Sequence, residues 1–226
     1  MSAGPAVSQR SVQIWPANII GDLTVPATPR GIVVFAHGTG SSRLSPRNRF
    51  VAEVLNQARF GTLLLDLLTA EEEQIDLRTR HLRFNIGLLA ARLGDATNWL
   101  ASEPDTGLLP IGYFGASTGA AAALIASAQF PDSTRAVVSR GGRPDLAREA
   151  LRDVKAPTLL IAGGNDSPVL ELNRLALNEL RCEAKLEIVP GATHLFEEPG
   201  TLETVAALAR NWFQQHLAAG ANSPDA

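Results

Sequence analysis

The residue of this chain whose sequence context best fits a catalytic role is a serine flanked by small residues. Residues 115–119 read Gly-Ala-Ser-Thr-Gly, after an apolar run at 111–114 and before an alanine-rich run at 120–128. Glycine-x-serine-x-glycine between a strand and a helix is typical of a nucleophile elbow, a sharp turn that exposes the serine hydroxyl. The pattern therefore predicts Ser117 as a nucleophile and the backbone amide of Thr118 as a hydrogen-bond donor to an oxyanion.

The pentapeptide alone could also be a glycine-softened loop before a helix, so its partners matter. An acyl-transfer serine needs a base, and the base needs a carboxylate that holds its tautomer. Asp166 lies in a Gly-Gly-Asn-Asp loop and His194 ends a Pro-Gly-Ala-Thr-His loop, and each loop follows an expected strand. The order serine, aspartate, histidine, with spacings of 49 and then 28 positions, predicts a catalytic triad.

Other residues compete for the same roles. His37 ends a strand and more plausibly shapes a turn, while His81 lies in a charged connection and His216 in the last helix. Asp66 and Asp145 also follow strands and remain alternatives for the orienting acid. The post-strand position favours His194 over the other histidines and Asp166 over the other aspartates.

A second oxyanion donor is expected from the loop His-Gly-Thr-Gly-Ser-Ser at 37–42. Its glycines would let the backbone approach a substrate closely, and we predict the amide of Thr39, with Gly40 as the alternative. A plain glycine turn would explain the same residues. Arg140 and Arg143 follow another strand and could hold a substrate carboxylate or phosphate; pairing with a nearby carboxylate is the structural alternative.

Apolar segments alternate with longer amphipathic ones, which predicts an α/β fold with a mostly parallel sheet covered by helices on both faces. About eight strands are expected, the first two as an antiparallel edge pair, at 11–15, 19–25, 31–36, 62–66, 111–114, 136–139, 158–163 and 185–189. Helices are expected at 46–58, 82–102, 119–129, 169–180 and 201–217. Ligands of such sheets bind at the carboxyl ends of the strands, where all the candidate loops begin.

The segment 69–83 carries three successive glutamates, Glu71 to Glu73, and then Arg78, Arg80 and His81. It could form a mobile flap over the pocket, or simply a solvated charged face.

Composition excludes several classes of function. The 226 residues are 45% hydrophobic and 19% charged with a net charge of −3, and no basic run suggests a nucleic-acid surface.

No apolar stretch is long enough for a signal peptide or a membrane span, so a cytoplasmic protein is expected. Cys182 is the single cysteine and we interpret it as incidental. We expect one domain at 1–218, a disordered tail at 219–226, and no cofactor or metal; nothing in the sequence indicates an oligomeric state.

Together, the serine elbow, the His-Gly loop, the Gly-Asn-Asp loop and Gly-Ala-Thr-His resemble the α/β-hydrolase superfamily over nearly the whole chain. The small size, without an insertion for a lid domain, looks most like its dienelactone-hydrolase-like branch. Dienelactone hydrolases use a cysteine nucleophile, whereas this chain has Ser117. The segment 139–145 also resembles small hydrolases that occur alone or fused to phosphoribosyltransferase domains.

The resemblance and the triad predict a serine hydrolase that cleaves a carboxylic ester, lactone or thioester of a small molecule through an acyl-enzyme. The rival from another class is a non-catalytic binding or partner module on the same fold. Elbow and triad specify acyl transfer and leave the acyl group open.

Overall fold

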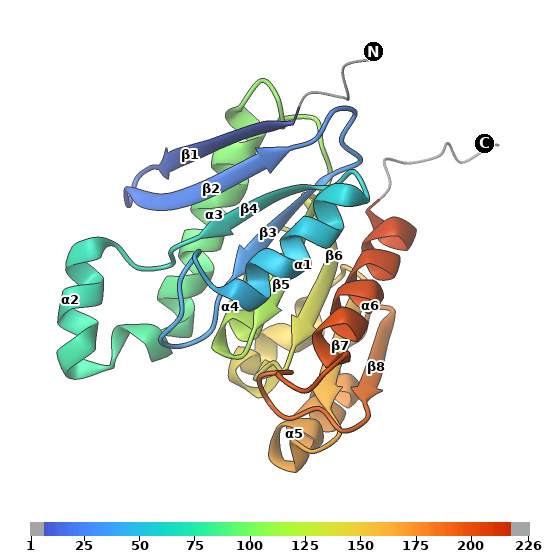
Figure 1. Cartoon of the computed structure of the whole chain (residues 1–226). Helices are drawn as coiled ribbons and strands as arrows, with labels where there is room; N and C mark the ends of the chain where they lie inside the picture. Colours follow the sequence, from blue (N-terminus) through green and yellow to red (C-terminus); the bar gives the residue numbers. More distant parts are fainter. Residues whose placement is uncertain (1–6, 218–226) are drawn as a thin grey trace.

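The computed structural model describes residues 7–217 and contains an eight-stranded sheet between two layers of helices (Figure 1). The expected disordered tail at 219–226 lies outside the described residues. The strand order is β1-β2-β4-β3-β5-β6-β7-β8. The predicted fold class, including the number of strands, is confirmed.

The strands lie close to the predicted ranges: β1 Ser8–Ile14, β2 Ile19–Val25, β3 Ile32–Ala36, β4 Gly61–Leu65, β5 Ile111–Ala116, β6 Thr134–Arg140, β7 Thr158–Gly163 and β8 Ala184–Val189. β1 and β2 form the predicted antiparallel edge pair, and β2 also runs antiparallel to β4. All other neighbours are parallel, so the loops after β3, β5, β6, β7 and β8 emerge at the same edge of the sheet. β3 and β5 are wholly buried, as expected of strands covered on both faces.

Helices cover both faces of this sheet. α1 (Pro46–Gln57) packs beside α6 (Thr201–His216) on one face, and α3 (Ile86–Ser102), α4 (Thr118–Gln129) and α5 (Ser167–Glu179) lie on the other (Figure 1). Each face has its own cluster of buried apolar side chains. In the part of the chain that is described, no helix combines the length and apolarity needed to cross a bilayer.

α4 packs against β5 and β6 with small side chains. Ala120, Ala121, Ala122 and Ala123 are all fully buried. Alanine lets the helix backbone approach β5 and the neighbouring helices without leaving voids. The helix that begins at the elbow is therefore held rigidly against the core.

Three elements were missed by the periodicity argument. α2 (Ala70–Thr79), with the short 3₁₀ turn η1 (Leu82–Phe84), occupies the segment considered as a flap, and a 3₁₀ segment η2 (Pro144–Asp153) follows β6. The predicted helix at 82–102 therefore begins later, at Ile86, because the side chain of Asn85 accepts a hydrogen bond from Leu88 N and caps α3.

α2 projects from one side of the molecule and is fixed by ion pairs (Figure 1). Its start has a capping box between Thr69 and Glu72, and Glu72 also accepts a hydrogen bond of 2.7 Å from Arg92 of α3. Asp76 is fully buried and pairs with Arg83. Burial raises the pKa of Asp76, but hydrogen bonds from Arg83 and from the Leu82 amide outweigh it and hold this pKa below its ordinary value. The mobility of this segment stays a prediction.

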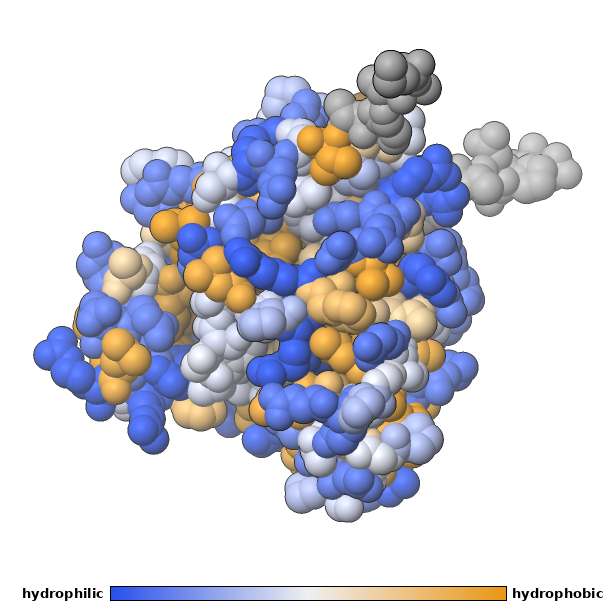
Figure 2. Space-filling model, viewed as in Figure 1, coloured by the Kyte–Doolittle hydropathy of each residue, from blue (hydrophilic) through white to orange (hydrophobic). Residues whose placement is uncertain are grey.

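On the face shown in Figure 2, hydrophobic residues lie in small groups among hydrophilic ones. Trp15, Leu77 and Phe84 are more than half exposed, and they belong to the β1–β2 turn, α2 and η1. Cys182 is partly buried, and burial raises the pKa of its thiol. Such a thiol is a weak nucleophile, in line with an incidental role.

Candidate active site

Ser117 occupies a strained turn between β5 and α4. Its φ of 51° and ψ of −122° lie in a region that residues with a side chain rarely adopt. Hydrogen bonds hold it there: Ser117 N donates to Arg140 O at 3.2 Å, and Ser117 O accepts from Arg143 N at 3.0 Å. The loop after β6 is thus bonded directly to the elbow and keeps the serine in this conformation.

Both flanking glycines are required by close packing. A Cβ atom on Gly119 would lie 2.3 Å from Ala36 O, and one on Gly115 would lie 2.4 Å from Ala120 Cα. These distances are far shorter than van der Waals contact, and the opposing atoms belong to the backbone. The spacing of glycine, serine and glycine is therefore a steric requirement of this turn.

Asp166 and His194 come together as the sequence predicts. Nδ1 of His194 donates a hydrogen bond of 2.7 Å to Oδ2 of Asp166. Asp166 directly precedes α5 but forms no capping hydrogen bond with its own side chain, so the carboxylate is available for the histidine. The Asp166 side chain is 12% exposed and that of His194 is 37% exposed. The acceptor fixes the proton on Nδ1, which leaves Nε2 as the basic nitrogen.

Ser117 and His194 line one cavity of about 160 Å³. Its complete lining comes from the loops after β3, β5, β6 and β8 and from the start of α1: Gly38, Thr39, Ser41, Ser45, Arg47, Asn48, Ala116, Ser117, Arg140, His194 and Leu195. Among residues 7–217, no three His, Cys, Asp or Glu side chains group closely enough to hold a metal ion. The geometry suits a hydroxyl nucleophile beside an oriented imidazole.

The competing carboxylates already have partners. Asp66 accepts hydrogen bonds from the backbone and guanidinium of Arg43. Asp145 forms two hydrogen bonds with Arg143, of 2.9 and 2.8 Å. Unlike Asp166, neither aspartate forms a hydrogen bond with a histidine among the described residues.

The competing histidines lie elsewhere. His37 is largely enclosed, and burial lowers its pKa although a hydrogen bond to Gly38 O opposes the shift. Nδ1 of His37 donates to Gly38 O at 3.0 Å, and Nε2 accepts from Leu67 N at 3.1 Å, so this ring is neutral and ties two loops together. His81 is exposed after α2, and His216 lies at the end of α6.

The loop after β3 is fixed beside the elbow. The hydroxyls of Thr39 and Thr118 lie 2.9 Å apart in a hydrogen bond. Thr118 is the first residue of α4, so its amide has no acceptor within the helix. Gly40 lines adjoining cavities instead of the one that contains Ser117. This placement favours the amide of Thr39 over that of Gly40 as the second donor.

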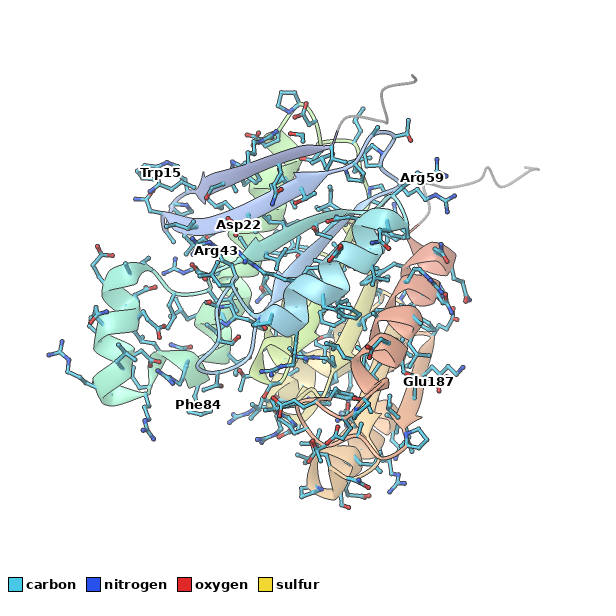
Figure 3. The ribbon with its side chains drawn as sticks, viewed as in Figure 1. Trp15, Asp22, Arg43, Arg59, Phe84 and Glu187 are labelled. Atoms are coloured by element: carbon cyan, nitrogen blue, oxygen red, sulfur yellow. The ribbon has the colours of Figure 1, made fainter. Side chains whose placement is uncertain are left out.

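Arg43 anchors the other end of this loop. Besides its bonds to Asp66, its Nε lies 3.5 Å from Oδ2 of Asp22 on β2, and Figure 3 shows the side chains of Asp22 and Arg43 close together. The loop is thereby attached to β2 through Asp22 and to the residue that follows β4, Asp66. A rigid support of this kind preorganises the backbone amides that a reaction uses.

The two predicted anion-binding arginines differ in their surroundings. Arg143 does not line the cavity, and its guanidinium forms two hydrogen bonds with Asp145, which favours the structural alternative of pairing with a nearby carboxylate. Arg140 is 7% exposed and lines the cavity, and its Nε and Nη1 have no hydrogen-bond partner among the described residues. Burial, with the nearby charge of Arg47, lowers the pKa of Arg140 to about 10.

Sequence reasoning missed Arg47 and Asn48, which enter the cavity from the first turn of α1. Nothing in their local sequence marks them. One feature of the sequence could have indicated them. They come just after the loop 37–45, and this loop follows β3, which ends at the catalytic edge of the sheet.

Curated relatives cover the chain but are longer. Two proteins from Mycobacterium tuberculosis, from the strains H37Rv and CDC 1551 and each provisionally named a phosphoribosyl transferase, are 61% identical over 218 residues, which is 96% of this chain and 48% of theirs. The chain thus spans about half the length of the curated relatives it matches.

Solved structures and a family profile agree on the fold. The structure of a dienelactone hydrolase from Anabaena variabilis is 60% identical, with a TM-score of 0.91 over 95% of this chain and 100% of that one. Est1E from Butyrivibrio proteoclasticus shares the fold at 16% identity, with a TM-score of 0.74 over 91% of this chain and 98% of that one. The dienelactone hydrolase family profile matches residues 23–218. This chain therefore belongs to the dienelactone hydrolase family.

Proposed function

We propose that this chain is a serine hydrolase that cleaves a carboxylic ester, lactone or thioester of a small molecule through an acyl-enzyme. The family and fold are those of hydrolases of ester-like substrates. The observation that carries the finer proposal is that His194, which is hydrogen-bonded to Asp166, lines the same cavity as Ser117 at the strained elbow.

In the first half of the reaction, Oγ of Ser117 attacks the substrate carbonyl while Nε2 of His194 takes its proton. Asp166 keeps the proton of His194 on Nδ1 and stabilises the imidazolium that forms. The imidazolium then gives its proton to the leaving oxygen or sulfur, and the acyl group stays on Ser117.

In the second half, His194 deprotonates a water molecule that attacks the acyl-serine, and the proton returns to Ser117. Each tetrahedral intermediate carries a negative oxygen. The amides of Thr118 and Thr39 are the proposed donors, and the hydroxyl pair of the same two residues holds their loops together. Removing one such donor costs on the order of 3 kcal/mol in comparable enzymes.

We do not propose phosphoribosyl transfer for this chain, although the Mycobacterium tuberculosis relatives carry that name. That name belongs to proteins about twice as long, and the part shared with this chain coincides with the hydrolase family match. A non-catalytic module would have no need of a strained serine beside an oriented histidine, because such strain costs on the order of 1–3 kcal/mol.

The test compares the wild type with Ser117→Ala on short p-nitrophenyl esters and the matching thioesters. We expect turnover to fall by about 10³-fold or more, because the nucleophile is lost. Ser102→Ala, at the exposed end of α3, is the matched control and should leave turnover unchanged. Equal turnover by wild type and Ser117→Ala would refute the proposal.

A further inference from the structure

The wall of the catalytic cavity contains hydrogen-bond donors that have no acceptor. Nε and Nη1 of Arg140 and Nε of Arg47 are buried and without a partner among residues 7–217. Both arginines line the cavity with Ser117 and His194. A buried guanidinium without an acceptor is costly, so native structures retain one mainly where a ligand completes it.

Among residues 7–217, only one of the two arginines of this wall is paired with a carboxylate. Among the described residues Arg140 has no salt-bridge partner, whereas Arg47 bonds through Nη1 to Glu197 at 3.0 Å, and the Glu197 side chain is 62% exposed. The charges of Arg47 and Arg140 are close enough to repel each other, since Arg47 lowers the pKa of Arg140. An anion between them would relieve both the repulsion and the missing hydrogen bonds.

We propose that Arg140 and Arg47 form a subsite for a dianionic phosphate or phosphonate group on the substrate, next to the scissile bond. The proposal rests on the proposed function, because it specifies the substrate of that same cavity. Arg140 brings an unpaired positive charge, and Arg47 a second guanidinium whose partner Glu197 is exposed; together they match a phosphate monoester better than a singly charged carboxylate. Three guanidinium nitrogens without a partner supply hydrogen-bond donors for the terminal oxygens of a phosphoryl group.

The remaining groups of the wall fit this ligand. Asn48 also lines this wall, and its Nδ2 group can donate a hydrogen bond to a phosphate oxygen. The cavity of about 160 Å³ has the volume of roughly five water molecules, which accommodates a phosphoryl group beside an ester carbonyl. Arg143, which follows the same strand, makes no such subsite because Asp145 occupies its guanidinium.

A binding experiment tests the subsite without requiring turnover. Calorimetry on the Ser117→Ala protein at constant ionic strength would compare inorganic phosphate with acetate. We expect phosphate to bind with a Kd of about 1 mM or tighter and at least about ten times more tightly than acetate. Arg140→Met should weaken phosphate binding by about 30-fold or more, and Arg140→Lys by less, because lysine keeps the charge but lacks the fork.

Arg152→Met is the matched control, since Arg152 pairs with Glu179 on the surface and lies outside the cavity. It should bind phosphate like the parent protein. Phosphate binding that is no stronger than acetate binding, or that Arg140→Met leaves unchanged, would overturn the proposal.

A kinetic experiment connects the subsite to substrate choice. The wild type would be given p-nitrophenyl 3-phosphonopropanoate, the p-nitrophenyl monoester of succinate, and the neutral p-nitrophenyl methyl succinate. We expect kcat/KM to fall in that order. Arg140→Met should lower kcat/KM by at least about 30-fold on the phosphonate but by less than about threefold on the neutral ester.

Equal losses on all three substrates would mean that Arg140 serves the reacting carbonyl. A preference of the wild type for the succinate monoester would favour a carboxylate as the ligand. Either result overturns the proposal. Absence of turnover on every ester, with phosphate still bound through Arg140, would refute the proposed hydrolase and leave the anion subsite standing.

Discussion

Replacing Arg140 with methionine should stabilise the protein in the absence of ligand. The guanidinium is 7% exposed and two of its nitrogens have no acceptor among residues 7–217. Methionine has a similar length and can pack against the same surroundings without a charge. Most substitutions of buried residues destabilise a protein, so a gain in stability here would be diagnostic.

The magnitude follows from the pKa of Arg140. Burial and the charge of Arg47 lower that pKa to about 10, which corresponds to a cost on the order of 3 kcal/mol for the charged form. The pKa remains above neutrality, so at pH 7 the side chain is charged and the full cost applies. This cost declines only as the pH rises through about 10, because there the folded protein releases its proton before the unfolded chain does. Arginine is larger than methionine, so the substitution also loses some packing contacts. We therefore expect the free energy of unfolding to rise by about 2 kcal/mol.

Thermal unfolding at pH 7 in a buffer free of phosphate would measure the effect. A gain of about 2 kcal/mol should raise Tm by roughly 4–8 °C in a chain of this size. Added phosphate should raise the Tm of the wild type and leave that of Arg140→Met unchanged, because ligand binding stabilises only the folded state that binds it. A fall in Tm that corresponds to more than about 2 kcal/mol would refute the reasoning, since it would mean that the guanidinium is satisfied in the native protein.

Three further predictions concern the triad, the elbow and α2. Asp166→Asn should keep the fold but lower kcat on any ester by about 10²–10⁴-fold, because the amide no longer holds the proton of His194 on Nδ1; a loss smaller than threefold would contradict its role. Gly119→Ala should abolish folding or lower the unfolding free energy by more than about 3 kcal/mol, because its Cβ would lie 2.3 Å from Ala36 O, and urea titration would measure it. Asp76→Ala should loosen α2 and speed limited proteolysis within residues 70–84, since it leaves the partly buried Arg83 without its carboxylate; unchanged cleavage would show that the pair does not hold this segment.

The fold could be predicted because its strands and most of its helices carry strong periodic signals. The buried strands β3, β5 and β7 are short apolar runs, and the order of Ser117, Asp166 and His194 follows from the order of the loops after β5, β7 and β8. α2 could not be found in the same way because its sequence lacks an apolar stripe. The only local signal was the capping box of Thr69 and Glu72.

The sequence could not separate Arg140 from Arg143. Arg140 is the last residue of β6 and Arg143 comes three residues later, and Asp145 follows both along the chain. Their surroundings differ because of the path of the chain after β6. Arg143 lies beside Asp145 at the start of η2, whereas Arg140 is buried next to the elbow. Arg47 was invisible for a related reason, because its proximity to Arg140 depends on how α1 packs on the sheet.

Labelling with a fluorophosphonate, followed by mass spectrometry of the digested protein, tests the central claim most directly. An activated serine reacts with this reagent, whereas an ordinary serine hydroxyl does not. We expect a single adduct on Ser117 in the wild type, and none in Ser117→Ala or in a variant that lacks His194. An unlabelled wild type, or an adduct that forms equally without His194, would contradict the assignment of Ser117 as a nucleophile activated by the His194–Asp166 pair.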